Sequence, residues 1–456
     1  MNESKIWIAR DFFSRIQSSG GFLSTDLPKS EASMANSYSI LFNTSQLLSL
    51  EGPYASDGTP RRPGEMQDLG IHERGAIVFN ESGVLAVGSE DELRRQFPDP
   101  DAEIDVEGRM VMPGLVDCHT HLVFGGNRSE EMMMRLQGAT YLDILKAGGG
   151  INHTVKATRQ ASVQDLTDRA AAHLDRMLEH GTTCVEVKTG YGLDEPTEMK
   201  ILDVVGELEQ LHPMTLFRTF LGAHTVPKGV DRQAYLDWLK GPSLAAFQRK
   251  ATFFDVFCED GAFSKEETLD LLRHAKEAGF HLKLHAGQFN DLGVCTPAAE
   301  MGTVSIDHLD HISDDQLQAM AKYGCVGVML PGVPFFLKTG IYPDARRFHQ
   351  METPFAIATD FNPGSCPSFS MQMMIALAVL ECRATLEEAI CGATYNAACA
   401  LGAGKNFGSL APGKAADLIV LDVESYNEIP YYFGGNLVQS VFKGGELVGS
   451  STMVMA

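Results

Sequence analysis

The 456-residue sequence predicts an α/β protein built on a closed (β/α)8 barrel, with a small β-sandwich domain formed from both chain ends. Two observations predict this architecture. Between positions 109 and 401, short apolar runs alternate with longer amphipathic stretches, the pattern of repeated βα units around a parallel sheet. β-rich runs flank this stretch on both sides, and because a lone hairpin is marginally stable, the two ends are expected to complete one domain.

Eight apolar runs are the expected barrel strands. They span 111–117, 183–189, 215–221, 252–258, 281–286, 303–308, 325–330 and 355–360. Eight such units favour a closed barrel over an open sheet. Helical stretches separate the runs, and one of them, 265–279, places its apolar residues on one helical stripe.

The small β domain is expected over 37–108 and 402–456, on either side of the barrel at 109–401. Its runs are SYSILFNTSQLLSL and GAIVFNESGVLAVG before the barrel, and ADLIVLD and LVQSVFKGGELV after it. Residues 1–36 form a Ser-rich leader, in which Met34 offers an alternative start. Disorder is expected only at the chain ends, so this leader is expected to be dispensable.

Composition excludes several classes of function. The formal net charge of −22 repels polyanions, so nucleic acid and anionic membrane surfaces are poor partners. The longest apolar stretch, 373–380, is too short to span a membrane, and the N-terminus lacks the apolar core of a secretory signal. Nine cysteines, an odd number without a C-x-x-C pair, indicate neither a disulfide framework nor a thiolate metal site. We therefore expect a protein of the reducing cytoplasm.

A cluster of metal-binding residue types marks the expected strand ends. His119 and His121 lie two apart after the first strand, so both imidazoles face one side of an extended chain. His285, His308 and Asp360 end strands five, six and eight, and barrel enzymes assemble their sites at this face. Imidazole and carboxylate suit zinc, iron or manganese. The alternative is that these are satisfied polar residues at strand ends.

One metal ion is favoured over two. At strand four, where a binuclear barrel hydrolase would often place a bridging carboxylated lysine, the chain has Phe257, Cys258, Glu259 and Asp260. Three histidines and one aspartate exceed the usual three protein ligands of zinc, so a bound water would make the site five-coordinate. Lys188, near the end of strand two, is interpreted as a solvated or paired charge.

Further polar residues follow other strands at the same rim. Arg128 lies in a Gly-Gly-Asn-Arg loop after strand one, where a guanidinium can grip a carboxylate through two hydrogen bonds. Tyr191 and His224 follow strands two and three and offer hydrogen-bond donors there, although each alone is more often structural. Gly364 and Ser365 lie in a turn-rich segment whose backbone can approach a ligand closely.

The order H-x-H, His, His, Asp along the strands resembles the amidohydrolase superfamily, as do PGLVDCHTH and LAPGKAADLIVLD. Within it, the chain is similar to the imidazolonepropionases over nearly everything after residue 37. Blocks that carry this resemblance include FGGNRSEE, GATYLDILKAGGGI, GTTCVEVKTGYGLDE, TFLGAHTVP, DVFCEDGAFS, KLHAGQF, DHLDHIS, LPGVPFFL and ATDFNPGSCPS.

The resemblance implies a hydrolase of histidine degradation that opens the cyclic amide of 4-imidazolone-5-propanoate to N-formimidoyl-L-glutamate with a metal-activated water. It implies one divalent ion, zinc or iron, bound by His119, His121, His285 and Asp360. The implied contacts to this small anionic substrate are Arg128, Tyr191, His224, Gln288, Asn362, Gly364 and Ser365. A homodimer is also expected.

Gln288 departs from the family pattern, because some imidazolonepropionases have glutamate there. A glutamine can orient a substrate but cannot accept the proton, so Asp360 is expected to be the base and His308 the group that orients and stabilises the oxyanion. Two rival functions stay open. One is a cyclic-amidine deaminase of the same superfamily, which releases ammonia, and the other is a non-catalytic barrel used for binding or assembly.

Overall fold

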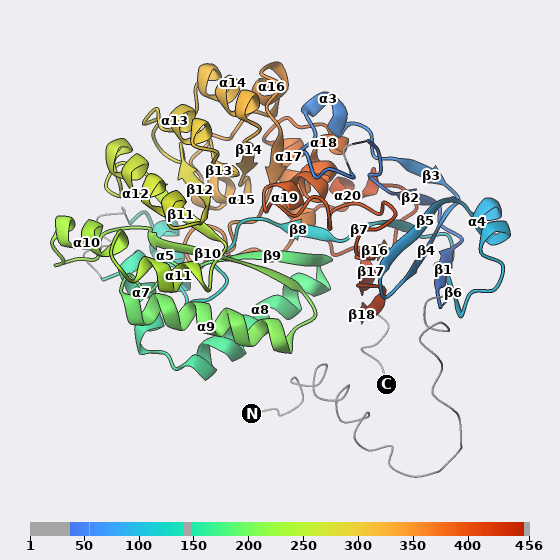
Figure 1. The fold of residues 1–456 in the computed structure, drawn as a ribbon, viewed down its shortest axis with the longest axis horizontal. Coiled ribbons are helices and arrows are strands. Elements are labelled where there is room, and N and C mark those ends of the chain that lie inside the picture. The colour runs from blue at the N-terminus through green and yellow to red at the C-terminus, as the bar shows by residue number, and fades with distance from the viewer. Residues whose placement is uncertain (1–36, 54, 140–147, 451–456) are drawn as a thin grey trace, which may run out of the picture.

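The computed structural model describes residues 37–53, 55–139 and 148–450 (Figure 1). Its centre is an eight-stranded parallel sheet in which the strands follow one another in chain order from β8 to β15. The sheet closes on itself just beyond these strands, where Thr120 and Phe361 form a parallel bridge and the His121 backbone N–H donates to the Phe361 carbonyl at 2.8 Å. The predicted barrel is therefore confirmed. Its strands are β8 (Leu115–Asp117), β9 (Thr182–Lys188), β10 (Thr215–Ala223), β11 (Phe253–Cys258), β12 (His281–Ala286), β13 (Ser305–His308), β14 (Val326–Met329) and β15 (Phe355–Ile357).

Helices follow the strands and cover the outside of the barrel (Figure 1). After β8 come α5 (Ser129–Leu136), α7 (Ile151–Gln160) and α8 (Val163–Glu179), and after the next strands come α9 (Glu195–Leu211), α10 (Arg232–Leu239), α11 (Leu244–Gln248), α12 (Lys265–Glu277), α13 (Cys295–Glu300), α14 (Asp314–Tyr323), α15 (Gly332–Leu337), α16 (Ala345–Gln350), α17 (Met371–Leu380), α18 (Leu386–Gly392) and α19 (Tyr395–Cys399). In α12 the buried residues form the stripe that the sequence predicted, and Ser264 caps its N-terminus by accepting from the Glu267 N–H.

One predicted strand is divided between two sheets. The run 111–117 was expected to be a single barrel strand, but β7 (Met110–Pro113) pairs antiparallel with β16 (Leu418–Leu421), and only β8 enters the barrel. Gly114 lies at the switch between the two sheets, where a Cβ atom would be 2.4 Å from side-chain atoms of Thr183. The chain can cross this close to the barrel wall only without a side chain, and an apolar pattern does not reveal such a switch.

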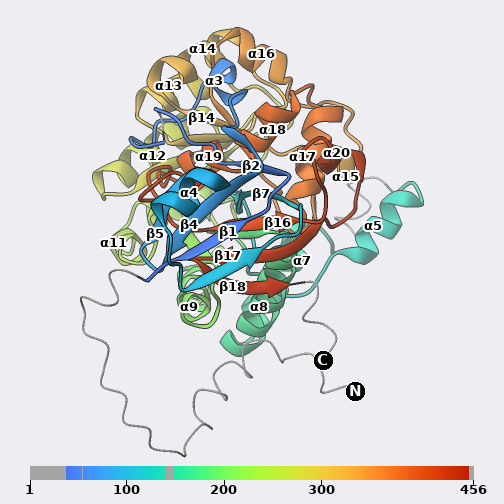
Figure 2. The ribbon, with the colours of Figure 1, turned by 90° about the vertical axis from the view of Figure 1, so that its right-hand side faces the viewer.

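Two further sheets lie outside the barrel, one built from the N-terminal segment 39–105 alone and one from strands of both ends of the described chain (Figure 2). One has the order β5-β4-β1-β6 and the other the order β18-β17-β16-β7-β2-β3, and a cluster of buried side chains such as Leu41, Ile77 and Phe442 packs between them. The remaining elements are β1 (Ser39–Phe42), β2 (Gln46–Leu48), α3 (Pro63–Met66), β3 (Ile71–Glu73), β4 (Gly75–Asn80), β5 (Gly83–Ser89), α4 (Glu90–Gln96), β6 (Ala102–Asp105), α20 (Glu428–Tyr431), β17 (Val438–Lys443) and β18 (Glu446–Ser450). The domain boundaries stay a prediction, and the leader 1–36 with Met34 lies outside the described residues.

Within the described ranges, every helix is too short or too polar to cross a membrane. The nine cysteines are all free and buried. Burial raises the pKa of the thiols of Cys258 and Cys391, to about 11 and about 12 respectively, so these thiols are protonated and unreactive near neutral pH.

Candidate metal centre and substrate site

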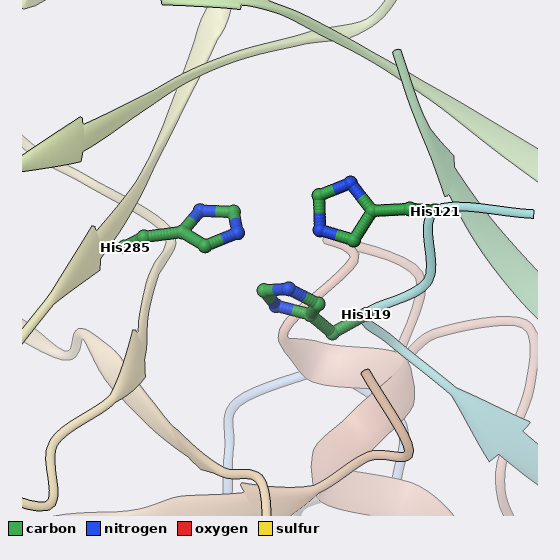
Figure 3. Close-up of side chains that lie close together, drawn as sticks. All are labelled: His119, His121 and His285. Carbon is green, nitrogen blue, oxygen red and sulfur yellow. The ribbon is translucent and has the colours of Figure 1, made fainter. Parts of the chain in front are cut away.

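The predicted metal ligands converge at the carboxyl ends of the barrel strands. His119 and His121 follow β8, and His285 is the penultimate residue of β12. The rings of the three histidines face a common point (Figure 3). One nitrogen from each of these histidines lies within 4.8 Å of the others, and the same holds for the ligand atoms of His119, His308 and Asp360. The structure thus brings together all five residues that the strand-end pattern selected.

These residues fit a divalent cation. Nε2 of His119, Nε2 of His285 and Oδ1 of Asp360 are buried and have no hydrogen-bond partner among the described residues. Burial lowers the pKa of the His119, His121 and His285 rings well below the usual range, and the neutral imidazole is the form that binds metal. Burial also raises the pKa of Asp360 to about 8, so a cation beside this carboxyl group would stabilise its ionised form.

Two buried aspartates orient the histidine ligands. His119 Nδ1 lies 2.7 Å from Asp307 Oδ2, and His285 Nδ1 lies 3.1 Å from Asp255 Oδ1. Because a carboxylate only accepts, each neutral ring donates its Nδ1–H and keeps the Nε2 lone pair for the shared point. Carboxylates in this arrangement fix the tautomer and the direction of a metal-binding histidine.

A fully buried charge network lies beneath these aspartates. Lys188 Nζ donates to Asp255 at 2.7 Å, to Glu186 at 3.0 Å and to Asp307 at 3.3 Å, and Lys283 Nζ donates to Glu186 at 2.8 Å. The carboxylates raise the pKa of Lys188 although burial alone would lower it, so its ammonium stays charged. The expectation of a paired charge is confirmed, whereas a solvated lysine is wrong, because this side chain is completely buried.

The sequence carried a signal for this network that our prediction did not use. Glu186 and Lys188 are spaced by two in an otherwise apolar strand, as are Lys283 and His285. Residues with this spacing point to one side of a strand, so charges at these positions must enter the barrel interior together. Only pairing among several strands makes such burial tolerable.

The Arg128 guanidinium lies between a glutamate and a glycine. Its Nε and Nη2 donate to Glu131 Oε2 at 2.9 and 2.8 Å, while Glu131 Oε1 accepts from the Gly150 N–H at 2.9 Å. On the other side, a Cβ built on Gly364 would be only 2.0 Å from Arg128 Nη1. The arginine is therefore held in place, and residue 364 must be glycine for the guanidinium to lie there.

The segment after β15 folds into a tight turn around Asn362. Its side-chain amide donates to the Asp360 carbonyl and to Ser365 Oγ, both at 2.7 Å, and its Oδ1 accepts from the N–H groups of Gly364 and Ser365, both at 2.8 Å. Both donors and the oxygen of Asn362 are thus used within the turn. Ser365 Oγ in turn lies 3.3 Å from Asp360 Oδ2, so the turn fixes the predicted metal ligand.

Two of the site residues adopt backbone conformations that non-glycine residues rarely take. Asp360 has φ 51° and His308 has φ 81°, followed by Leu309 with φ 65°. Such conformations cost energy and are maintained only where the surroundings determine them, as at ligand-binding sites. The sequence gives no sign of them.

Tyr191 and His224 lie beside the His121 ring. The rings of His121 and His224 are stacked with centroids 5.1 Å apart, and the Tyr191 ring lies 5.6 Å from each of them. Gln288 is partly exposed on the loop after β12, and buried Glu259 holds this loop by accepting from the Phe289 N–H at 2.8 Å. Substrate contacts by Tyr191, His224 and Gln288 stay a prediction.

Comparison with known proteins identifies the family. The family model described as "Amidohydrolase family" matches residues 110–448, which spans the barrel and most of the second β segment. The chain belongs to the amidohydrolase family. Within this family it groups with the imidazolonepropionases, since it is 43% identical to the imidazolonepropionase of Geobacillus kaustophilus over 410 residues, covering 88% of this chain and 96% of the relative. The imidazolonepropionase of Symbiobacterium thermophilum is 44% identical over 398 residues, or 86% and 94% of the two chains.

Solved structures of other amidohydrolase-fold enzymes share the architecture at much lower identity. Escherichia coli guanine deaminase aligns with a TM-score of 0.68 at 15% identity, covering 91% of this chain and 99% of that one. An adenosine deaminase from Xanthomonas campestris with bound zinc aligns with a TM-score of 0.67 at 17% identity, covering 90% and 92%. At this identity the likeness concerns the fold alone.

Proposed function

We propose that the protein hydrolyses the cyclic amide of 4-imidazolone-5-propanoate to N-formimidoyl-L-glutamate, as an imidazolonepropionase of histidine degradation. The observation that carries this proposal is the identity of 43% to an imidazolonepropionase over 96% of that enzyme's length. The convergence of histidines and aspartate at the carboxyl ends of the strands supports it, because this constellation suits hydrolysis by a metal-activated water.

The proposed cofactor is one divalent ion, zinc or iron, held by His119, His121, His285 and Asp360. The donor set supports this, since neutral imidazoles and a carboxylate suit both metals. When bound, such an ion acts as a Lewis acid and supplies an activated water. The unpartnered ring nitrogens and the unpartnered Asp360 oxygen are the atoms that would hold it.

The proton transfers are assigned to the protein's own side chains. Asp360 accepts a proton from the attacking water and returns it to the leaving ring nitrogen. His308 is buried, and its Nδ1 has no hydrogen-bond partner in the part of the chain that the structure describes, so it can orient the ring and stabilise the oxyanion. Gln288 orients the substrate but takes no proton.

Arg128 binds the propionate carboxylate in this proposal. Glu131 occupies one edge of the guanidinium, whereas Nη1 lies on the side of Gly364 and is used by no hydrogen bond within the described residues. Tyr191 and His224 contact the ring, and the Ser365 hydroxyl and the Gly364 backbone complete the pocket. Because Asn362 is saturated by its own turn, its contribution is to shape that pocket.

The reaction itself is the test. Purified, metal-replete enzyme given freshly made 4-imidazolone-5-propanoate should abolish the ultraviolet absorbance of the imidazolone and form a product with the mass of N-formimidoyl-L-glutamate, without ammonia. Ammonia released in step with turnover would favour the deaminase alternative. No turnover by metal-replete enzyme would reject the proposal.

We also propose a cytoplasmic homodimer. Exposed apolar side chains lie on α5, α15, α17 and α20, including Met133, Phe335, Leu380 and Tyr431. Two pairs of these helices are in contact, since Arg135 of α5 lies over the Phe336 ring of α15, and α17 packs against α20. Sedimentation at micromolar concentration should give a dimer, and Tyr431→Asp should shift it toward monomer; a monomeric wild type would contradict the proposal.

A further inference from the structure

A completely buried glutamate organises the loop that carries Tyr191. Glu198 belongs to the first turn of α9 and has no solvent exposure. Its Oε2 accepts from the Gly190 N–H at 2.9 Å, and its Oε1 accepts from the N–H groups of Gly192 and Leu193, both at 2.7 Å. One carboxylate therefore holds three backbone donors of the segment 190–193, which directly follows β9.

This loop has a backbone that does not form by itself. Gly190 has φ 105° and Leu193 has φ 55°, and a Cβ on Gly192 would be 2.6 Å from the Glu198 backbone nitrogen. Without Glu198 three buried N–H groups would lack partners, which is costly enough for the loop to rearrange. The place of Tyr191 at the site thus depends on Glu198.

The same loop determines which nitrogen of His224 carries its proton. His224 Nδ1 lies 3.1 Å from the Gly190 carbonyl oxygen. A carbonyl only accepts, so Nδ1 is the donor, and the neutral form of the ring leaves its other nitrogen, Nε2, without a proton. Nε2 then carries a lone pair, and His224 offers an acceptor to a ligand instead of the donor expected from the sequence.

We propose that Glu198 is a positioning residue for substrate recognition: through the loop 190–193 it fixes Tyr191 and holds His224 with Nε2 as the acceptor for an N–H group of the substrate. The proposal rests on the function proposed above and states which group of the substrate His224 recognises. A neutral imidazolone ring presents one N–H donor, so His224 selects for the nitrogen that carries it while Arg128 selects for the carboxylate.

The test compares two buried glutamates that cap backbone N–H groups. In Glu198→Gln, the amide oxygen can accept either from the Gly190 N–H or from the N–H groups of Gly192 and Leu193. The NH2 group of the glutamine then faces the remaining N–H donor or donors and cannot accept from them. Glu388→Gln is the matched control. Glu388 is 1% exposed and accepts from the Thr385 N–H at 2.8 Å. It belongs to α18, a helix that carries no proposed site residue. We expect Glu198→Gln to raise KM about tenfold or more with kcat changed by less than about threefold.

Two readouts separate positioning from a general loss of stability. Metal content should be unchanged in both variants, and amide hydrogen exchange over 190–193 should accelerate only in Glu198→Gln. Glu388→Gln should lower the melting temperature without changing KM. If Glu198→Gln lowered the melting temperature like the control and kept the wild-type KM, the proposal would be overturned.

A substrate analogue gives an independent measurement on the wild type, which also serves if Glu198→Gln does not fold. A neutral imidazolone ring carries one N–H group, so an analogue of 4-imidazolone-5-propanoate methylated at either ring nitrogen has no N–H donor and should bind about tenfold more weakly than the substrate. Analogues that bind as tightly as the substrate would refute the acceptor role of His224. A wild type that fails to open the unmodified ring would instead overturn the proposed function.

Discussion

Single side chains beneath the metal centre are expected to control how firmly it holds its ion. Asp307 accepts from His119 Nδ1 at 2.7 Å. Asp307→Asn keeps the side-chain volume, but its NH2 group can donate to His119 Nδ1 and so favour the tautomer of His119 that carries its proton on Nε2. That tautomer lacks the Nε2 lone pair, so we expect metal affinity to fall roughly tenfold to a hundredfold. Competition with a chelator, followed by elemental analysis, measures this. Asp417→Asn is the control, because Asp417 is buried and paired with Lys443 away from the site; equal metal loss in both variants would contradict the prediction.

A methyl group at residue 364 should weaken substrate binding without removing the metal. In Gly364→Ala the new Cβ would lie 2.0 Å from Arg128 Nη1, which is too close for two non-bonded atoms, so the guanidinium must move. Displacing a bidentate partner of a carboxylate should raise KM at least tenfold, with metal content unchanged. Gly88→Ala is the control, since nothing lies within 4 Å of a Cβ built there. A Gly364→Ala enzyme with the wild-type KM would place the carboxylate elsewhere.

At this scale the sequence predicted the residues that converge at the strand ends better than those that support them. His119 and His121 could be found because their spacing and strand-end position carry the signal. Asp307 could not, since its role depends on contact with a histidine that is distant in the sequence. The turn-rich segment around Asn362 was recognised, but its hydrogen bonds were not predicted, because they depend on backbone angles that one sequence does not reveal.

Among the elements, α12 offers a direct measurement of local helix stability. Ser264 accepts from the Glu267 N–H, and the Glu267 carboxylate accepts from the Ser264 N–H at 2.8 Å. Ser264→Ala should lower the free energy of unfolding by about 1 kcal/mol, measured by urea denaturation. Ser243 precedes α11 but makes no such side-chain bond, so Ser243→Ala should change stability much less. The reverse order of effects would show that the cap does not stabilise α12.

The elements themselves were predictable where the pattern is local. The stripe of α12 and the alternation of strands and helices follow from spacing alone. The division of 111–117 into β7 and β8 was not predictable, because it depends on Thr183 approaching Gly114 from another strand. Apolar character shows that such a segment is buried but not which sheet it joins.

For the whole molecule, the pairing of the chain ends could be expected but not its details. β7 and β16 are far apart in the sequence and pair residue by residue, Met110 with Leu421 and Pro113 with Leu418. The sequence indicated β-rich runs at both ends, and the argument that neither is stable alone joined them. The predicted β-sandwich implies two sheets, but the sequence did not predict their strand order, because strand order depends on packing across the whole chain.

The junction between the barrel and these sheets makes stability depend on pH. Lys414 is buried there: its carbonyl accepts from the Val84 N–H of β5, and its Nζ lies over the Tyr395 ring of α19 and donates to the Gly404 carbonyl at 2.5 Å. Burial lowers the pKa of Lys414 to about 8, below that of an unfolded lysine.

Between about pH 8 and pH 10.5 the unfolded chain therefore binds more protons at this position than the folded chain does, so the contribution of Lys414 to stability rises with pH. Below pH 8 both states are charged and the full cost of burying the ammonium remains.

Lys414→Met removes this group, so the melting temperature of the wild type minus that of the variant should increase from pH 7 to pH 10. Lys156 is exposed on α7, and Lys156→Met controls for the loss of a lysine charge. A difference that stays constant or falls with pH for Lys414→Met would contradict the prediction, because only a buried ammonium that loses its proton in the folded state gives a rise.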